Sequence, residues 1–216
     1  MKKTLFLLLT AFSTSILADV AQVNIWKAYP GRMADMFDSA MKAKAIHEKN
    51  GATVSIATDQ HLNMHYVAIF DTWEDWGKFS GKMLNNAEWD EYWTQALANP
   101  AAELIDTLHV DNPNPSEAKA VAIIYMWDVD PGKTQEMVAR ATEAIGIHNA
   151  LGASASINID DIGNLHYEMS FDSWAAWGKF SAASQESEAW AEFQTKYSQP
   201  IARLAKVYRL NVMPDQ

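Results

Sequence analysis

The alternation of apolar and polar residues along the chain predicts the same series of strands and helices twice. Short apolar stretches alternate with longer segments whose apolar residues recur at helical spacing. The order in each half is strand, helix, strand, strand, helix, strand, which is the ferredoxin-like β-α-β-β-α-β unit. The strands are expected at residues 21–29, 52–58, 64–70 and 104–110, and again at 122–129, 153–159, 165–171 and 204–212.

The first helix of each half has an apolar stripe that ends on a histidine. Small and apolar side chains recur on one face, and His47 or His148 continues that face at the C-terminal end. Gly51 and Gly152 then end the two helices. Both histidines are therefore expected to face the sheet. The stripe consists of Met33, Met36, Phe37, Ala40 and Ala43 in the first helix and of Met137, Val138, Ala141, Ala144 and Ile145 in the second.

The two halves are copies of one unit. When residues 23–90 are aligned without gaps on residues 124–191, 25 of the 68 pairs are identical, which indicates a duplication. The chain is therefore divided into a first ferredoxin-like repeat, a linker rich in Pro and Asn, and a second repeat. These parts are expected at residues 19–111, 112–119 and 120–216.

The N-terminus predicts export. Lys2 and Lys3 precede an apolar run over residues 5–12, and a small residue, Ala18, follows at a suitable distance. This is the pattern of a secretory signal peptide, here over residues 1–18 with cleavage near Ala18. The apolar run is too short to span a bilayer. The mature chain is accordingly expected to be periplasmic or secreted.

Charge and cysteine content limit the partners and the chemistry. The formal net charge is −10, and loss of the signal lysines makes the mature chain more acidic still. Nucleic acids and anionic membranes require clustered Lys and Arg, so neither is expected as a partner. The sequence has no cysteine, which excludes disulfides, thiolate catalysis and Cys-ligated metals.

The strongest motifs lie where the third strand of each repeat ends. The strand ends in Phe-Asp-Thr-Trp or Phe-Asp-Ser-Trp, and a helix with the sequence Trp-Gly-Lys-Phe-Ser follows at residues 76–80 and 177–181. With this element order, the chain resembles the dimeric α/β-barrel (ferredoxin-like) superfamily and its antibiotic-biosynthesis-monooxygenase-like members. The resemblance implies an α+β fold in which the two repeats pack sheet to sheet as an intrachain pseudo-dimeric α/β barrel.

The resemblance also implies a range of functions. The superfamily includes cofactor-free monooxygenases, isomerases and haem-binding or haem-degrading proteins, with pockets between the sheet and the helices. One haem-degrading branch uses an Asn on the first strand, a Trp, and a His in the second helical region. Asn24 matches the first, but residues 73–99 contain no histidine and Tyr125 replaces Asn24 in the second repeat. Haem degradation is therefore not carried over.

Histidine and aspartate supply the candidate catalytic groups. His47 and His148 face the sheet beside alanines, where each can act as a general base or bond to a ligand. Asp71 and Asp172 follow the strand that ends near these histidines, so each is a candidate to orient the imidazole. The alternatives are a histidine bonded to a backbone carbonyl and an aspartate that favours the helix dipole.

Aromatic side chains supply the candidate ligand-binding wall. Tyr66 and Tyr167 are expected to face the helices, whereas the neighbouring His65 and His166 face the barrel interior. A polar interior can hold a ligand or form a satisfied interface between the repeats. Four tryptophans after the strand either line an apolar pocket or pack the helices onto the sheet. They are Trp73, Trp76, Trp174 and Trp177.

These observations favour one hypothesis and leave two alternatives. The favoured function is an exported small-molecule-binding barrel, with a cofactor-independent monooxygenase or isomerase acting on a small apolar or aromatic compound as its catalytic form. The alternatives are a non-catalytic structural or interaction module and a haem-binding protein. His61 and His65 lie across a turn rather than on one helix face, so no metal is expected, and no cofactor is predicted. Self-association is left open.

Overall fold

The computed structural model describes residues 19–214 of the 216-residue chain and contains eight strands and six helices in that part. The predicted signal peptide lies outside the described residues. The first repeat contains β1 (Asp19–Ala28), α1 (Met33–Lys49), β2 (Thr53–Thr58), β3 (Met64–Phe70), α2 (Trp73–Met83), α3 (Ala87–Ala98) and β4 (Ala102–Asn112). The second contains β5 (Val121–Val129), α4 (Thr134–Ala150), β6 (Ser154–Asp160), β7 (Leu165–Phe171), α5 (Trp174–Glu186), α6 (Glu188–Lys196) and β8 (Ala202–Val212).

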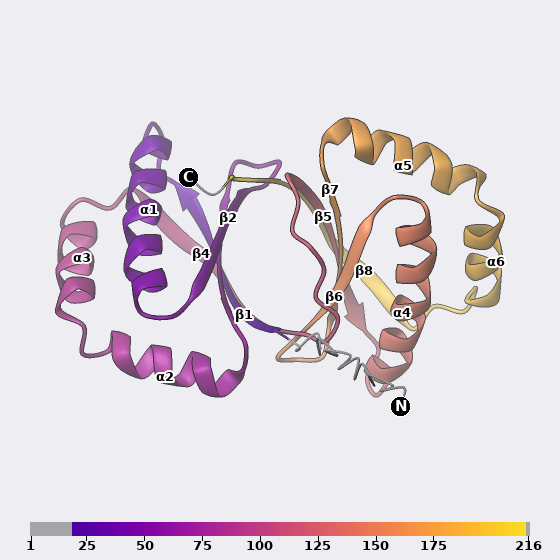
Figure 1. Ribbon diagram of the computed structural model, residues 1–216, viewed down its shortest axis with the longest axis horizontal. Coiled ribbons are helices and arrows are strands. Elements are labelled where there is room, and N and C mark those ends of the chain that lie inside the picture. Colours follow the sequence, from indigo (N-terminus) through magenta and orange to yellow (C-terminus); the bar gives the residue numbers. More distant parts are fainter. Residues whose placement is uncertain (1–18, 215–216) are drawn as a thin grey trace, which may run out of the picture.

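The eight strands form one closed barrel. Their order around it is β1-β3-β2-β8-β5-β7-β6-β4, so each repeat contributes four adjacent strands in the same internal order. Figure 1 shows the two sheets facing each other across the centre of the molecule, with the helices of each repeat on the outside. The predicted α+β fold and its pseudo-dimeric barrel are confirmed.

Short ladders join the two repeats. At one junction Ala57↔Val212 and Thr58↔Asn211 pair, and the Met213 N–H donates to the Ile56 carbonyl at 2.9 Å. At the other junction Val110↔Asp160 and Asp111↔Ile159 pair. Side chains extend both junctions. The Gln60 amide donates to the Val207 carbonyl at 3.0 Å and accepts from the Arg209 N–H at 2.8 Å, as a peptide group of a neighbouring strand would. At the other junction, His109 Nδ1 lies 3.4 Å from an Asp161 carboxylate oxygen.

The outer face of each sheet packs against its helices. Met36, Ala40 and Ala43 of α1 are buried against Val54, Ile56 and other residues of the sheet, as the apolar stripe predicts. The second repeat has an equivalent core beneath α4. A third cluster, which includes Ile25, Ala57, Ala122, Tyr208 and Leu210, fills part of the barrel interior. The helices thus bury one face of each sheet, and the opposite repeat covers the other.

Local signals place the element ends. Thr72 and Ser173 cap α2 and α5, each accepting a bond from the backbone N–H three residues on. Gly31 has φ 75, so Pro-Gly forms the preceding turn and α1 begins two residues later, at Met33. The helical region after β3 divides into α2 and α3 because Asn86 caps α3. The region after β7 divides into α5 and α6 because Ser187 caps α6.

Leu62 occupies a backbone conformation that favours glycine. It has φ 64, and the equivalent position of the second repeat is Gly163, with φ 87. A left-handed residue with a Cβ costs roughly 1–2 kcal/mol. The Leu62 side chain is 59% exposed, so little packing offsets this cost.

We expect Leu62→Gly to raise the free energy of unfolding by roughly 0.5–1 kcal/mol, because relief of backbone strain exceeds the added freedom of the unfolded chain. Urea unfolding followed by far-UV circular dichroism measures this change. Leu97→Gly is the matched control, since Leu97 is an exposed leucine in α3 and glycine should there destabilise by about 1 kcal/mol. A loss of stability in Leu62→Gly would show that the backbone of Leu62 is not strained in the folded protein.

Candidate functional site

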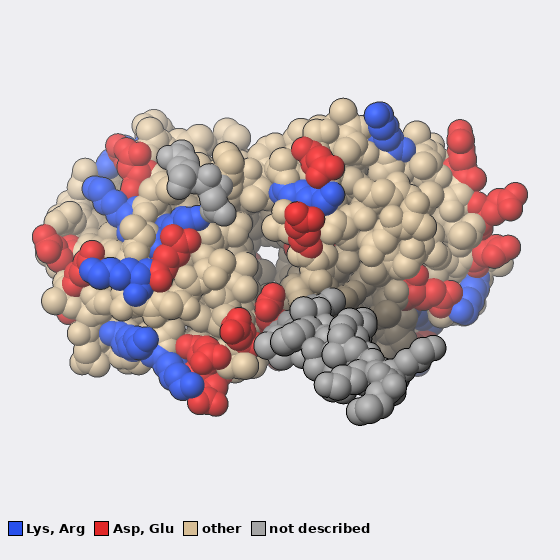
Figure 2. All heavy atoms as spheres, viewed as in Figure 1, with Lys and Arg blue, Asp and Glu red and all other residues tan. Residues whose placement is uncertain are grey.

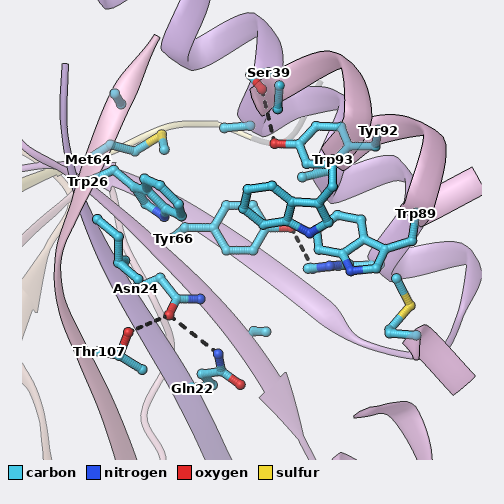
Figure 3. Close-up of a pocket in the computed structure, with 18 of the residues that line it drawn as sticks. Gln22, Asn24, Trp26, Ser39, Met64, Tyr66, Trp89, Tyr92, Trp93 and Thr107 are labelled. Carbon is cyan, nitrogen blue, oxygen red and sulfur yellow. Dashed lines mark hydrogen bonds between the residues drawn. The ribbon is translucent and has the colours of Figure 1, made fainter. Parts of the chain in front are cut away.

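The first repeat encloses a cavity between its sheet and its helices. The cavity has a volume of about 660 Å³. Its floor is the outer face of β1, β3 and β4, and α1 and α3 form its sides (Figure 3). The exposed side chains of Leu84 and Leu97 lie at its margin. A space of this size accommodates a small organic molecule.

Aromatic rings form most of its wall. Trp93 lies between Trp26, with ring centroids 6.4 Å apart, and Trp89, with centroids 5.5 Å apart. Trp89 also stacks on Tyr92 at 4.8 Å, and the Tyr92 hydroxyl bonds to Ser39 at 3.0 Å. Figure 3 shows these rings together with Tyr66 around one space. Flat faces of this kind suit a planar apolar ligand.

One end of the cavity is polar, and a chain of hydrogen bonds fixes the orientation of the Asn24 amide there. The Trp76 indole N–H donates to Gln22 Oε1 at 3.0 Å, and an indole can only donate. The Gln22 amide nitrogen therefore donates to Asn24 Oδ1, at 3.3 Å. The Thr107 hydroxyl donates to the same oxygen at 3.0 Å. This leaves the Asn24 amide nitrogen without a bond to any described residue and available to a ligand (Figure 3).

His47 faces the sheet as predicted, and its partner is Tyr66. Its Nδ1 lies 2.9 Å from the Tyr66 hydroxyl, and its ring also contacts Phe79 and Trp89. Burial among these rings lowers the pKa of His47 to about 4, so the imidazole is neutral at pH 7. Burial raises the pKa of Tyr66, which stays protonated. The two rings line the cavity as a neutral hydrogen-bonded pair.

The second repeat contains the same pair. His148 Nδ1 lies 2.8 Å from the Tyr167 hydroxyl, and Phe180 and Trp190 surround the ring. Burial lowers the pKa of His148 to about 4 as well. Nδ1 of each histidine thus has a tyrosine hydroxyl as its partner, in place of the backbone carbonyl that was the alternative.

The predicted Asp–His pairs do not form. Asp71 is exposed, and no hydrogen bond joins it to His47 among residues 19–214. Asp172 is also exposed and pairs with Lys119 at 3.1 Å. Side chains of a helix point toward its N-terminus, so the imidazole of His47 leans away from the strand end and toward Tyr66. Both aspartates instead precede the N-caps of α2 and α5.

The four predicted tryptophans pack beside the cavity rather than line it. The indoles of Trp73 and Trp174 donate to Asp111 and Asn211 at 2.7 and 2.8 Å, and Trp76 supports Gln22. Trp177 packs against the core of the second repeat. The lining tryptophans are Trp26, Trp89 and Trp93. Of these, the sequence repeat includes Trp26 and Trp89, but Gln194 stands where Trp93 has its equivalent.

His65 and His166 lie on the inner face of the barrel, as predicted. Each is buried and bonds through Nε2 at 3.3 Å to an aspartate at the end of the preceding strand, Asp59 directly after β2 or Asp160 as the last residue of β6. They therefore do not belong to the cavity of the first repeat.

Larger or apolar side chains occupy the equivalent positions of the second repeat. Arg140 stands in place of Ser39, and its guanidinium lies 4.7 Å from the centre of the Tyr197 ring. Met169 replaces Ala68 and is buried in the core. The replacements are Ile123 for Gln22, Tyr125 for Asn24, Arg140 for Ser39, Met169 for Ala68, Tyr197 for Ala96 and Val207 for Thr107. The polar end with its free amide is thus specific to the first repeat.

The described residues contain no group of three or more His, Cys, Asp or Glu side chains that could hold a metal ion. Within the same residues, no helix is long and apolar enough to cross a membrane.

Comparisons with known proteins support the fold. No family model matches the sequence, and no curated protein matches it. A presumed monooxygenase from Fusobacterium nucleatum superposes with a TM-score of 0.67 at 9% identity, over 92% of this chain and 94% of that one. An anthrone oxidase-like protein gives 0.58 at 12% identity, over 91% and 92%. A haem-binding protein from Thermus thermophilus gives 0.51 at 8% identity, also over 91% and 92%.

These neighbours belong to the dimeric α/β-barrel superfamily. At such low identity the likeness establishes the fold alone. The chain is a two-repeat α/β barrel in which a single polypeptide supplies both ferredoxin-like halves, and its first repeat contains an aromatic cavity with a polar end.

We expect acid to destabilise the fold through its buried histidines. In the unfolded chain His47 and His148 titrate near 6.5, and in the folded protein near 4. Above pH 6.5 both states are neutral, so the stability is fully present. As the pH falls toward 4 the unfolded state binds protons that the folded state does not, and stability is lost. Burial also lowers the pKa values of His65 and His166, which adds in the same direction.

Urea midpoints at pH 7.5, 6.0 and 5.0 test this dependence. The midpoint should decrease at each step, and the decrease should be smaller in His148→Gln, which has one fewer buried imidazole. An unchanged midpoint between pH 7.5 and 5.0 would show that these histidines remain accessible to protons.

Proposed function

We propose that this protein binds a flat, largely apolar aromatic compound in the cavity of the first repeat. The observation that carries the proposal is the Asn24 amide, held by Gln22 and Thr107 with its nitrogen unpartnered in an aromatic-walled space. An N–H donor in such a place selects an acceptor, such as a carbonyl or phenolate oxygen, at one edge of the ring system. The rings of Trp26, Trp89 and Trp93 contact the faces of the ligand.

The catalytic form of this proposal is a cofactor-independent monooxygenase or isomerase. A donor at a carbonyl oxygen stabilises the enolate that forms when a neighbouring carbon loses a proton. Tyr66 and His47 supply a hydrogen-bonded route for that proton, although the low pKa makes His47 a weak base. Return of the proton to another carbon isomerises the substrate. Reaction of the carbanion with O₂ instead gives a hydroperoxide, whose loss of water leaves a new carbonyl group.

The location and the partners follow the sequence. We propose export through a signal peptide over residues 1–18, so that the ligand is met in the periplasm or outside the cell. Among solved structures of this fold, one is described as anthrone oxidase-like and another as haem-binding. The first description fits a tricyclic aromatic ketone in the cavity. His148 of the second repeat lies among larger side chains, so the first repeat is the proposed site of activity.

We expect the mature protein to bind anthrone, with quenching of its tryptophan fluorescence. Asn24→Ala should weaken binding by roughly 5–100-fold, since it removes the donor at the buried acceptor. Asn85→Ala is the matched control, because Asn85 is an exposed asparagine outside the cavity lining. Oxygen uptake and product analysis then distinguish an oxygenase from a binding protein.

Ala68→Met tests the location of the site. It places in the first repeat the residue that the second repeat has as Met169, so it should fill the cavity and abolish anthrone binding while the protein stays folded. Binding that survives both Asn24→Ala and Ala68→Met would place the ligand elsewhere and overturn the proposal. A stoichiometric Soret band on addition of haemin, lost in Ala68→Met, would favour a haem-binding protein instead.

A further inference from the structure

The inner face of the barrel has a polar wall that the cavity does not use. β6 and β7 pair so that three inward positions on each strand lie opposite one another. The pairs are Ser154↔Ser170, Ser156↔Glu168 and Asn158↔His166. In the first repeat, Val67 and Ile69 replace Glu168 and Ser170. Figure 2 shows a small opening at the centre of the molecule, where the barrel of Figure 1 has its interior.

The two inner histidines present acceptors to this interior. Each bonds through Nε2 to a carboxylate, which accepts, so Nε2 carries the hydrogen. Because the neutral ring has one hydrogen, Nδ1 of His65 and of His166 is a free lone pair. No hydrogen bond joins either Nδ1 to a described residue, and the side chains of His65 and His166 are only 4% and 7% exposed.

Glu168 and Ser156, on the same polar wall as His166, also have hydrogen-bonding capacity that no described residue uses. Glu168 accepts only from the Ser170 hydroxyl, at 3.2 Å, and forms no ion pair within residues 19–214. Burial raises the pKa of its carboxyl group, since no nearby cation compensates. Ser156, directly opposite, is 3% exposed as a whole residue, and no hydrogen bond joins its hydroxyl to another residue in the described part of the chain. The hydroxyl therefore remains available to water or to a ligand in the interior.

We propose that the barrel interior is a second binding site, for a small aliphatic amine that carries its positive charge to Glu168. The polar wall offers acceptors and a carboxylate, which match the several N–H donors of an ammonium group. Two exposed residues act on the inner histidines with opposite charge. Asp106 works to raise the pKa of both, and Lys206, whose ammonium lies 4.4 Å from the Tyr208 ring, works to lower the pKa of His65. A bound metal is a poorer fit, since β3 and β7 stand on opposite sides of the barrel.

Isothermal titration calorimetry of the mature protein with 1,4-diaminobutane tests the proposal. Wild type should bind, and Glu168→Gln should weaken binding at least about tenfold, since it removes the charge and keeps the shape. Glu186→Gln, at an exposed position at the end of α5, should bind like wild type. 1,4-Butanediol, which has the same length and no charge, should not bind. Glu168→Gln should unfold at an equal or higher urea concentration, because it no longer buries a carboxyl group.

Three outcomes would overturn the second site. The first is no heat of binding from the diamine with wild type at millimolar concentration. The second is equal binding of the diol, which would make the interior a site for neutral polar molecules. The third is an equal loss of affinity in Glu186→Gln, which would assign the binding to the acidic surface. Because Asn24 lines the cavity and not the barrel interior, Asn24→Ala should bind the diamine like wild type. Failure of the diamine test therefore leaves the proposed anthrone site standing, and failure of the anthrone test leaves the interior site standing.

Discussion

The whole structure depends on covering the inner face of a four-stranded sheet. In each repeat the helices lie on one side of the sheet only, and the other side contains apolar residues such as Ile25 or Ile124 that must also leave water. The sheet of the second repeat covers the inner face of the first, and the sheet of the first repeat covers the inner face of the second. Closure needs few backbone bonds, because each junction has two paired residues on each strand and a side-chain contact, with one further bond from the Met213 N–H to the Ile56 carbonyl. With the two halves in one chain, closure does not depend on protein concentration.

A duplicated fold frees one copy to change. The barrel and both outer cores must be preserved, but the space between sheet and helices can be filled or left open in each repeat separately. In the second repeat, Met169, Tyr197 and Arg140 occupy that space and add packing contacts. In the first repeat, Ala68, Ala96 and Ser39 leave it open, at a cost in stability. A space left open at such a cost is a reason to expect a ligand.

The fold could be predicted from the sequence because the hydrophobic pattern of each element is local and occurs in both repeats. The strand order within a repeat follows from the β-α-β-β-α-β series, and the apolar stripe on α1 places His47 toward the sheet. The candidate site was harder to predict. The aromatic wall depends on α3, where Trp89 is the one aromatic residue repeated without change, and the partner of His47 depends on which way its side chain leans. Tyr66 was predicted on the correct face, but Asp71 was the candidate partner that the element order offered, and the backbone direction of α1 points His47 toward Tyr66 instead.

The comparison between repeats also separates structural from functional residues. The His–Tyr pair occurs in both repeats with nearly the same distance, 2.9 and 2.8 Å, including the repeat whose space is occupied by larger side chains. A buried imidazole needs a partner in either case, so the fold alone explains the pair. Asn24, Gln22 and Thr107 have no such explanation, because apolar residues or a tyrosine replace them in the second repeat without loss of the architecture. The residues that differ between the repeats therefore identify the site more reliably than those that are shared.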